Sequence, residues 1–221
     1  MSTYAMILAA GRGKRMLPLT EQTPKPLLSL AGSALIVHHI KALAQSGIKD
    51  IVINLHHLAE NIKMALGNGE NWGVKLHYSL EPDLLETGGG IFQALPLLGH
   101  QPFIVVSADI WTDYNFSQLQ KPLKGMAHLV LVDNPPHHPL GDFVLKGEDI
   151  IEQDGPKLNF GNIGLYSPQL FHGCSPGHFP LGPLLRRTIQ AQQVTGEHFT
   201  GRWHNIGTAL QLKGLQQQYG D

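Results

Sequence analysis

The chain has 221 residues, 42% of them hydrophobic and 7% aromatic, so it can bury a core as one domain or as two small ones. Its 16 Lys and Arg residues nearly balance 17 Asp and Glu residues, giving a formal net charge of -1. This balance argues against nucleic acid or an anionic membrane as a partner, because binders of either usually carry a basic surface. The single cysteine, Cys174, cannot form an internal disulfide, and we expect a protein of the reducing cytoplasm.

Short apolar runs rich in Ile, Val and Leu predict buried strands. The run at residues 4–10 is too short for a membrane span and has no basic residue before it, so we expect a strand rather than a signal peptide. The expected strands cover residues 5–9, 51–54, 74–78, 103–107 and 127–132.

Helical patterns lie between these strands. Ser33 is a candidate N-cap for a helix that Gly47 ends, and further helices are expected near residues 58–66 and 89–95. This alternation predicts an α/β fold, a three-layer α/β/α sandwich around a mostly parallel, Rossmann-like mixed sheet.

The second half of the chain is expected to have a more α+β character. Its expected elements are hairpin-forming strands at 143–145 and 160–166, a helix at 183–193, and a helix at 208–219 that Thr208 caps. No linker rich in Gly, Ser or charge marks a boundary, so we expect residues 1–221 to form a single domain.

A glycine-rich loop, Ala10-Gly11-Arg12-Gly13-Lys14-Arg15, follows the first expected strand. Backbone N–H groups of such a loop can point toward a phosphate chain, and Lys14 and Arg15 add positive charge. The loop lacks the dinucleotide-binding fingerprint because Met16 stands at the third glycine position, and it lacks the Walker pattern at the same place. A glycine turn with solvated cations is the alternative interpretation.

Two further residues suit phosphate and metal chemistry. Lys25 lies between Pro24 and Pro26, which stiffen its backbone and so hold the lysine in one place. Asp109 follows the expected strand that ends at Ser107, and ligands of open α/β sheets bind at the carboxyl ends of strands. A carboxylate there can hold Mg²⁺ against phosphate oxygens, although a lone aspartate could equally cap a helix.

Residues 8–27 resemble the signature of the sugar-phosphate nucleotidylyltransferases: a Gly-x-Gly loop, an arginine, a Pro-Leu-Thr step and Pro-Lys-Pro. Segments such as Glu86-Thr87-Gly88-Gly89-Gly90 and Gly196-Glu197-His198 are most similar to short bacterial members that recycle cell-wall sugar. The resemblance implies Mg²⁺-dependent transfer of a uridylyl group from UTP to a sugar 1-phosphate, with N-acetylmuramate α-1-phosphate as the expected acceptor and pyrophosphate as the second product. The chain is also expected to lack the C-terminal β-helix of longer members, and it carries no signal for an oligomeric state.

The resemblance also implies a set of site residues. Arg15 would act on the leaving pyrophosphate, Lys25 on the α-phosphate or the sugar phosphate, and Asp109 on the metal. The expected nucleotide-binding residues are Ala10, Gly11, Arg12, Gly13, Arg15, Lys25, Glu81, Gly88 and Ser107. The expected sugar-binding residues are Gly141, Asp142 and Asn162. The nucleotide-binding part would then cover about residues 1–110 and the sugar-binding part about residues 111–221.

One position departs from the family pattern. The family's second metal-binding aspartate comes from a Trp-x-Asp-x-Gly-Thr segment, and Asn205 takes its place here. We expect Asp109 and Asn205 as the metal ligands, with weaker Mg²⁺ binding because an amide oxygen carries no formal charge. The enzyme would then need more magnesium, or the chain would be a non-catalytic nucleotide-sugar binding protein.

Base and sugar specificity stay open at this point. The Glu81 carboxylate can accept the N3–H of uracil but suits the paired donors of guanine equally well, so guanylyl transfer to mannose 1-phosphate or another sugar is an alternative. Glu81 could also be a plain surface acid. Gly88 would let a flat base approach the backbone. A lactyl carboxylate on the sugar would need a cation, for which Arg186 and Arg202 are candidates.

Overall fold

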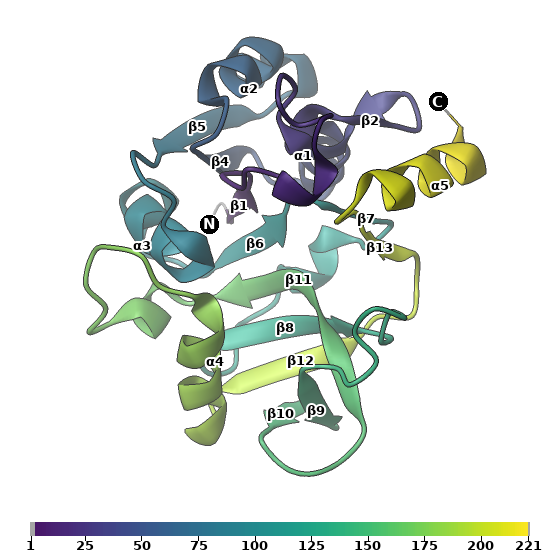
Figure 1. Ribbon diagram of the computed structural model, residues 1–221. Helices are drawn as coiled ribbons and strands as arrows, with labels where there is room; N and C mark the ends of the chain where they lie inside the picture. Colours follow the sequence, from purple (N-terminus) through teal and green to yellow (C-terminus); the bar gives the residue numbers. More distant parts are fainter. Residues whose placement is uncertain (1–2, 221) are drawn as a thin grey trace.

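The computed structural model describes residues 3–220. A nine-stranded sheet in the order β5-β4-β1-β6-β11-β8-β12-β10-β9 runs through the molecule (Figure 1). Its strands are β1 Tyr4–Leu8, β4 Asp50–Leu55, β5 Lys75–Leu80, β6 Phe103–Ser107, β8 Ala127–Val132, β9 Phe143–Lys146, β10 Asp149–Ile151, β11 Lys157–Tyr166 and β12 Val194–His198. Two small antiparallel pairs accompany it: β2 Ser29–Leu30 with β3 Ser33–Ala34, and β7 Ile110–Thr112 with β13 Trp203–Asn205.

Five α-helices and five short 3-10 helices are described. The α-helices are α1 Leu35–Gln45, α2 Ala59–Leu66, α3 Glu86–Leu98, α4 Leu181–Gln190 and α5 Ala209–Tyr219. The 3-10 helices are η1 Lys14–Met16, η2 Lys25–Leu27, η3 Glu70–Trp72, η4 Phe116–Leu119 and η5 Pro168–Phe171. Over residues 3–220, no helix has the length and apolar character needed to cross a membrane.

The sheet is parallel in its first half and mixed in its second. Strands β5, β4, β1 and β6 run parallel, so their carboxyl ends meet at one edge. Strand β11 runs antiparallel to β6 and β8, and β12 runs parallel to β8. The predicted strands agree in position with β1, β4, β5, β6 and β8. Because β1 and β6 are parallel neighbours, the chain segments that follow them lie close together.

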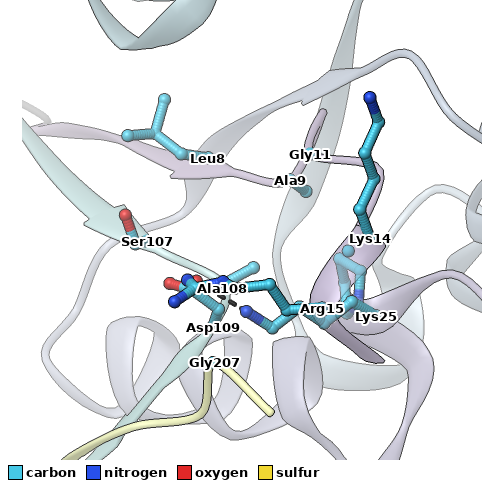
Figure 2. Close-up of a pocket in the computed structure, with 12 residues that line it drawn as sticks. Leu8, Ala9, Gly11, Lys14, Arg15, Lys25, Ser107, Ala108, Asp109 and Gly207 are labelled. Carbon is cyan, nitrogen blue, oxygen red and sulfur yellow. Dashed lines mark hydrogen bonds and ion pairs between the residues drawn. The ribbon is translucent and has the colours of Figure 1, made fainter. Parts of the chain in front are cut away.

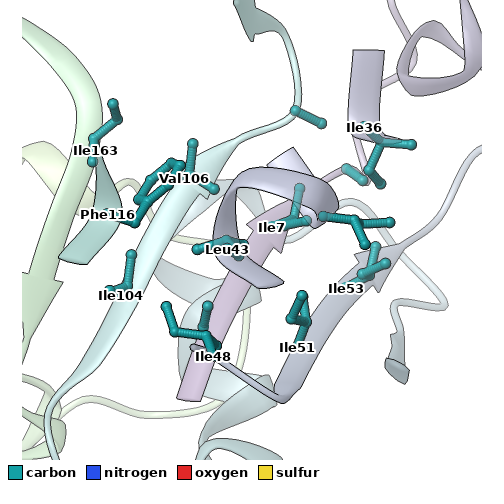
Figure 3. Close-up of a cluster of buried hydrophobic side chains, with 14 of the residues drawn as sticks. Ile7, Ile36, Leu43, Ile48, Ile51, Ile53, Ile104, Val106, Phe116 and Ile163 are labelled. Atoms are coloured by element: carbon teal, nitrogen blue, oxygen red, sulfur yellow. The ribbon is translucent and has the colours of Figure 1, made fainter. Parts of the chain in front are cut away.

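Helices cover both faces of the sheet, which confirms the predicted three-layer α/β/α architecture. Alternate side chains of a strand point to opposite faces. One face packs against α1 and α2: Figure 3 shows Ile7, Ile53 and Val106 of three neighbouring strands beside Ile36 and Leu43 of α1. The other face packs against α3 and α4, and its core contains Met6, Val52, Val105, Ile91 and Leu185.

A third apolar cluster fixes the segments that border the carboxyl edge of the sheet. Met16 of η1, Leu30 and Ile206 are fully buried in it together with Leu212 and Leu215 of α5. Helix α5 begins after Thr208, whose side chain accepts a hydrogen bond from the backbone N–H of Gln211 at 3.2 Å, as predicted. The cluster therefore fastens the glycine-rich loop and the segment after β13 to the same helix.

Two predicted helix starts are wrong. Helix α1 begins at Leu35 after an extended Ala34 and has no side-chain cap, whereas Ser33 lies in β3 and its hydroxyl accepts a hydrogen bond from Lys41 Nζ at 3.1 Å. Helix α3 begins at Glu86, three residues before the predicted start, and its glycines at 88–90 are so closely packed that an added Cβ would meet other atoms at 2.1–2.6 Å. Strands β10 and β12 were not predicted, since both are short and carry polar residues.

Candidate active site

A cavity of about 290 Å³ opens where β1 and β6 end (Figure 2). Its walls come from the glycine-rich loop, η2, the end of β6 and the segment after β13. The lining residues are Leu8, Ala9, Gly11, Gly13, Lys14, Arg15, Lys25, Pro26, Ser107, Ala108, Asp109 and Gly207. We call this space the phosphate cavity, because three of its side chains are cationic and its loop is rich in glycine.

The glycine-rich loop owes its shape to Gly13. This residue has φ +61, and a Cβ on it would lie 2.9 Å from Thr20 Cγ2, so a larger residue would be strained and crowded. Its carbonyl accepts hydrogen bonds from the backbone N–H of Met16 at 2.8 Å and from Thr20 Oγ1 at 2.9 Å. Gly11, by contrast, would have nothing within 4 Å of an added Cβ, and the backbone there is open to a ligand.

Lys25 and Asp109 are joined across the phosphate cavity. Lys25 Nζ donates a hydrogen bond to Asp109 Oδ2 at 2.7 Å, and the lysine residue is only 9% exposed (Figure 2). Pro24 leads into η2 in an extended conformation, and Pro26 follows Lys25 within that helix, as the prolines around Lys25 suggested. The cavity thus holds a buried cation and a carboxylate in direct contact.

The arginines of the loop differ in where they lie. Figure 2 shows Arg15 extending toward Asp109 and Gly207, and a Cβ on Gly207 would lie 3.2 Å from Arg15 Nη2. Glycine at position 207 therefore leaves room for the Arg15 guanidinium. Arg12 Nη2 lies instead 3.3 Å from His56 Nε2, and Arg12 does not line the phosphate cavity. Gly207 was not predicted as a site residue from the sequence, although it is the glycine of the Trp-x-Asp-x-Gly-Thr pattern in which Asn205 stands.

The pairing of β7 with β13 brings Asn205 beside Asp109. Asn205 pairs with Ile110, and the backbone N–H of Ile206 donates to the Asp109 carbonyl at 2.8 Å. Asn205 Oδ1 is buried and has no hydrogen-bond partner among the described residues. A buried acceptor without a partner is costly, and carboxylate and amide oxygens are donors that Mg²⁺ takes in proteins. The Asp109 carboxylate and the Asn205 amide oxygen are therefore the groups that would hold a magnesium ion here.

A second cavity, of about 220 Å³, adjoins the glycine-rich loop on the side of β4 and β5 and is lined by Leu8, Ala10, Gly11, Asn54, Glu81, Leu84, Glu86 and Thr87. Glu81 is only 2% exposed, so the surface-acid interpretation is wrong. Its Oε1 accepts a hydrogen bond from Asn54 Nδ2 at 2.7 Å, and its Oε2 accepts one from the backbone N–H of Leu85 at 3.1 Å. Asn54 Oδ1 in turn accepts from the N–H of Ala9 at 2.8 Å, so this network fixes the start of the loop.

Two glycines of α3 are closely packed against other side chains beside this cavity. Gly88 is buried in the first turn of α3, and a Cβ on it would lie 2.5 Å from Phe179 Cδ2. A Cβ on Gly90 would lie 2.6 Å from Glu81 Oε1. Gly88 and Gly90 thus make room for Phe179 and Glu81, and the approach of a base to Gly88 stays a prediction. Glu86 and Thr87 are the α3 residues that line the cavity.

A third cavity, of about 340 Å³, lies between α4 and β11 and receives the predicted sugar-binding residues Asp142 and Asn162. We call it the sugar cavity; its lining is Thr87, His138, Asp142, Phe143, Asn159, Phe160, Asn162, Pro180, Leu181, Gly182, Leu185, Arg186 and Asn205. Asp142 Oδ2 accepts from the N–H of Phe160 at 2.8 Å, and its Oδ1 lies 3.1 Å from His138 Nε2. Asn205 lines this cavity and not the phosphate cavity, so the two expected metal ligands, although neighbours, line different cavities.

The two remaining sugar-site residues are held by unusual backbone. Asn162 has φ +55 at a register shift in β11, and such bulges re-aim side chains. Gly141 has φ +63 and does not line the sugar cavity; a Cβ on it would lie 2.7 Å from Asn134 Oδ1, so it shapes the loop instead. Of the two candidate cations, Arg186 lines this cavity, whereas Arg202 is paired with Asp113 at 2.8 Å outside it.

Asp109 lines the phosphate cavity at the carboxyl ends of parallel strands, and the neighbouring Asn205 lines the polar sugar cavity, an arrangement that suits nucleotidyl transfer. The sequence pattern of the family described as nucleotidyl transferase matches residues 4–143, and the chain belongs to this family of enzymes. The N-acetylmuramate alpha-1-phosphate uridylyltransferase of Neisseria meningitidis serogroup B is 46% identical over 226 residues, with 98% of both chains covered.

Other known proteins are similar to this chain at lower identity. The protein of the same name from Caulobacter vibrioides is 31% identical, with 92% of this chain and 91% of the relative covered. The mannose-1-phosphate guanylyltransferase catalytic subunit beta of Drosophila melanogaster is 34% identical over 93% of this chain and 59% of the relative. The structure of a putative glucose-1-phosphate thymidylyltransferase from Bacillus anthracis superposes with a TM-score of 0.88 at 22% identity, covering 100% of this chain and 96% of the other, which confirms the fold.

Proposed function

We propose that the protein transfers a uridylyl group from UTP to N-acetylmuramate α-1-phosphate, giving UDP-N-acetylmuramate and pyrophosphate. The observation that carries this proposal is the 46% identity to the Neisseria enzyme over 98% of both chains. The phosphate and sugar cavities support it, because Asp109 lines the first, Asn205 lines the second, and the pairing of β7 with β13 brings these two residues together.

In the proposed reaction a phosphate oxygen of the sugar attacks the α-phosphorus of UTP. A new phosphorus–oxygen bond forms, the bond between the α-phosphorus and the bridging oxygen breaks, and pyrophosphate leaves with that electron pair. The attacking oxygen is already anionic, so no general base is required. The protein then acts by positioning the two substrates and by neutralising their charge.

Arg15, Lys25 and the two expected metal ligands position the substrates and neutralise their charge. Arg15 contacts the leaving pyrophosphate, because its guanidinium can bind two oxygens at once. Lys25 holds the α-phosphate or the sugar phosphate from its buried position. Asp109 and Asn205 are the residues that would hold Mg²⁺, which when bound neutralises phosphate charge. Arg15, Lys25 and Asp109 all line the phosphate cavity, and Asn205 is brought beside Asp109 by the pairing of β13 with β7, which supports this assignment.

The remaining roles follow the cavities. We assign the nucleotide to the loop from Ala10 to Gly13, with Ser107 at the end of β6, and the sugar to Asp142 and Asn162. Residues 1–110 would mainly bind the nucleotide and residues 111–221 the sugar. Gly207 in the phosphate cavity is an exception, since it comes from the second part. We further propose that the reaction occurs in the cytoplasm, where UTP is available, and recycles a cell-wall sugar.

Pyrophosphate release tests this function directly. The protein would be incubated with UTP, GTP, CTP or dTTP and a panel of sugar 1-phosphates across a magnesium titration. Release confined to UTP with N-acetylmuramate 1-phosphate is the expected result. Release with GTP and mannose 1-phosphate would favour the guanylyltransferase alternative, which the Drosophila relative supports. Tight nucleotide binding without magnesium and without turnover would favour a nucleotide-sugar binding protein, the alternative that Asn205 motivates.

A further inference from the structure

We propose that Arg186 determines sugar specificity by binding the lactyl carboxylate that distinguishes N-acetylmuramate from N-acetylglucosamine. This inference rests on the proposed function and names the feature of the acceptor that the sugar cavity selects. Arg186 is the one lysine or arginine among the residues that line this cavity. Its position on α4 sets it apart from the phosphate-binding cations Arg15 and Lys25, which lie in η1 and η2.

Arg186 stands where the sugar cavity meets further space. A neighbouring hollow of about 350 Å³ is lined by Asp142, Phe143, Ile151, Glu152, Gln153, Asp154, Lys157 and Arg186. Asp142, Phe143 and Arg186 belong to both spaces. A sugar bound at Asp142 and Asn162 would therefore have room for a substituent larger than a hydroxyl on the side where the guanidinium lies.

Two contacts orient the Arg186 guanidinium, although its side chain is 50% exposed. Nη1 donates a hydrogen bond to Glu152 Oε1 at 2.6 Å, and Cζ lies 5.4 Å from the centre of the Phe143 ring. A planar guanidinium that is paired at one nitrogen keeps further N–H donors for a second carboxylate. Because the side chain of Arg186 is held in place, less conformational entropy is lost when a substrate carboxylate binds.

Two of the three acidic residues that line these spaces are already engaged, and the third, Asp154, lines only the neighbouring hollow. Glu152 is paired with Arg186, and the two oxygens of Asp142 contact the N–H of Phe160 and His138. Repulsion of a substrate carboxylate by these groups is thereby reduced, while the charge-assisted hydrogen bonds to Arg186 remain specific to an anion. A neutral sugar of the same size would gain nothing from this arrangement.

Kinetics with three acceptors separate charge recognition from packing. The acceptors are N-acetylmuramate 1-phosphate, its lactyl amide, which has nearly the same size without the charge, and N-acetylglucosamine 1-phosphate, which lacks the lactyl group. The variants are Arg186→Met and, as a matched control, Arg187→Met, which removes an exposed arginine of the same helix outside the sugar cavity. Initial rates would be measured at saturating UTP and magnesium, with Tm recorded for each variant.

We expect Arg186→Met to raise KM for the acid about 10- to 100-fold with kcat little changed, since a charge-assisted pair is lost. KM for the amide and for N-acetylglucosamine 1-phosphate should change less than about twofold, and Arg187→Met should resemble the wild type. Equal losses for acid and amide, or no loss for either, would overturn the assignment of Arg186 while leaving the proposed function intact. If the wild-type protein shows no turnover with N-acetylmuramate 1-phosphate but uses another sugar 1-phosphate, both the assignment of Arg186 and the proposed function would be overturned.

Discussion

Lys25 Nζ contacts Asp109 Oδ2 at 2.7 Å, so the expected metal-binding carboxylate is paired with the lysine expected to bind phosphate. The lysine side chain is 11% exposed, and its charge is therefore little screened by solvent. In the absence of substrate this pair satisfies both charges. A bound nucleotide would give Lys25 a phosphate partner and leave the carboxylate to a metal ion, which links metal binding to nucleotide binding.

Replacement of this lysine should therefore separate metal affinity from activity. Lys25→Met should bind Mn²⁺ in the absence of nucleotide roughly tenfold more tightly than the wild type, because a nearby positive charge is removed. The same variant should lose about 100-fold in turnover. Electron paramagnetic resonance of free Mn²⁺ measures the first effect. Lys41→Met is the control, since Lys41 is exposed and contacts Ser33; equal Mn²⁺ affinity in all three proteins would refute the link.

Arg15 should matter for turnover and not for folding. Arg15→Ala should lower kcat about 100- to 1000-fold, because the guanidinium that meets the leaving pyrophosphate is lost. Its side chain is exposed and the apolar anchor of the loop is the neighbouring Met16, so Tm should stay within about 2 °C of the wild type. Arg187→Ala serves as a control for the loss of one arginine. Normal turnover in Arg15→Ala would remove this residue from the mechanism.

The replacement of an expected aspartate by Asn205 has a direct test. Asn205→Asp should lower the magnesium concentration needed for half-maximal turnover about tenfold, because a second carboxylate joins Asp109 at the metal. Mn²⁺ affinity in the presence of a non-hydrolysable UTP analogue should rise in parallel. Asn71→Asp adds the same charge at an exposed position in η3. If turnover, magnesium dependence and Mn²⁺ affinity all match the wild type, Asn205 is not a metal ligand.

Sequence reasoning located the phosphate cavity better than its surroundings. Lys25 and Asp109 could be predicted because each is marked locally, one by flanking prolines and the other by the end of an apolar strand. The burial of Glu81 could not, because it depends on the parallel pairing of β4 with β5, which brings Asn54 within 2.7 Å of its carboxylate. A single sequence gives no such register.

The same limit applies to short polar elements. Nothing local marks Trp203–Asn205 as a strand, yet its pairing with β7 is what brings Asn205 beside Asp109. The direction of a long side chain is also decided by its partner: Arg12 turns to His56, whereas Arg15 reaches the space left by Gly207. Ser33 failed as a helix cap because α1 begins only at Leu35, so that Ala34 takes the N-cap position and Ser33 pairs with Leu30 in the β2–β3 hairpin. Tertiary contacts, rather than local propensity, settled each of these cases.

A half-buried carboxylate away from the site, Glu197, should make stability depend on pH. Tyr114 OH donates a hydrogen bond to Glu197 Oε1, and His128 Nε2 lies 3.5 Å from Oε2 of the same carboxylate. Burial disfavours the ionised form, but His128, Tyr114 and Lys121 outweigh it and lower the pKa of Glu197 to about 2. Because an unfolded glutamate has a pKa of about 4.3, ionised Glu197 stabilises the fold above that pH and loses this contribution as the pH falls through 2.

Tyr114→Phe should therefore lower the free energy of unfolding by about 2 kcal/mol at pH 7, the value typical of a hydrogen bond to a charged group. Without the hydroxyl the pKa of Glu197 rises toward its ordinary value, so the penalty should shrink as the pH falls from about 4 toward 2. Urea unfolding at pH 7, 5, 4 and 3 measures it. Tyr78→Phe is the matched control, because Tyr78 OH donates to the Gly67 carbonyl at 2.6 Å and its penalty should not depend on pH over this range. A Tyr114→Phe penalty that stays constant from pH 7 to 3 would show that the hydroxyl does not support an ionised Glu197.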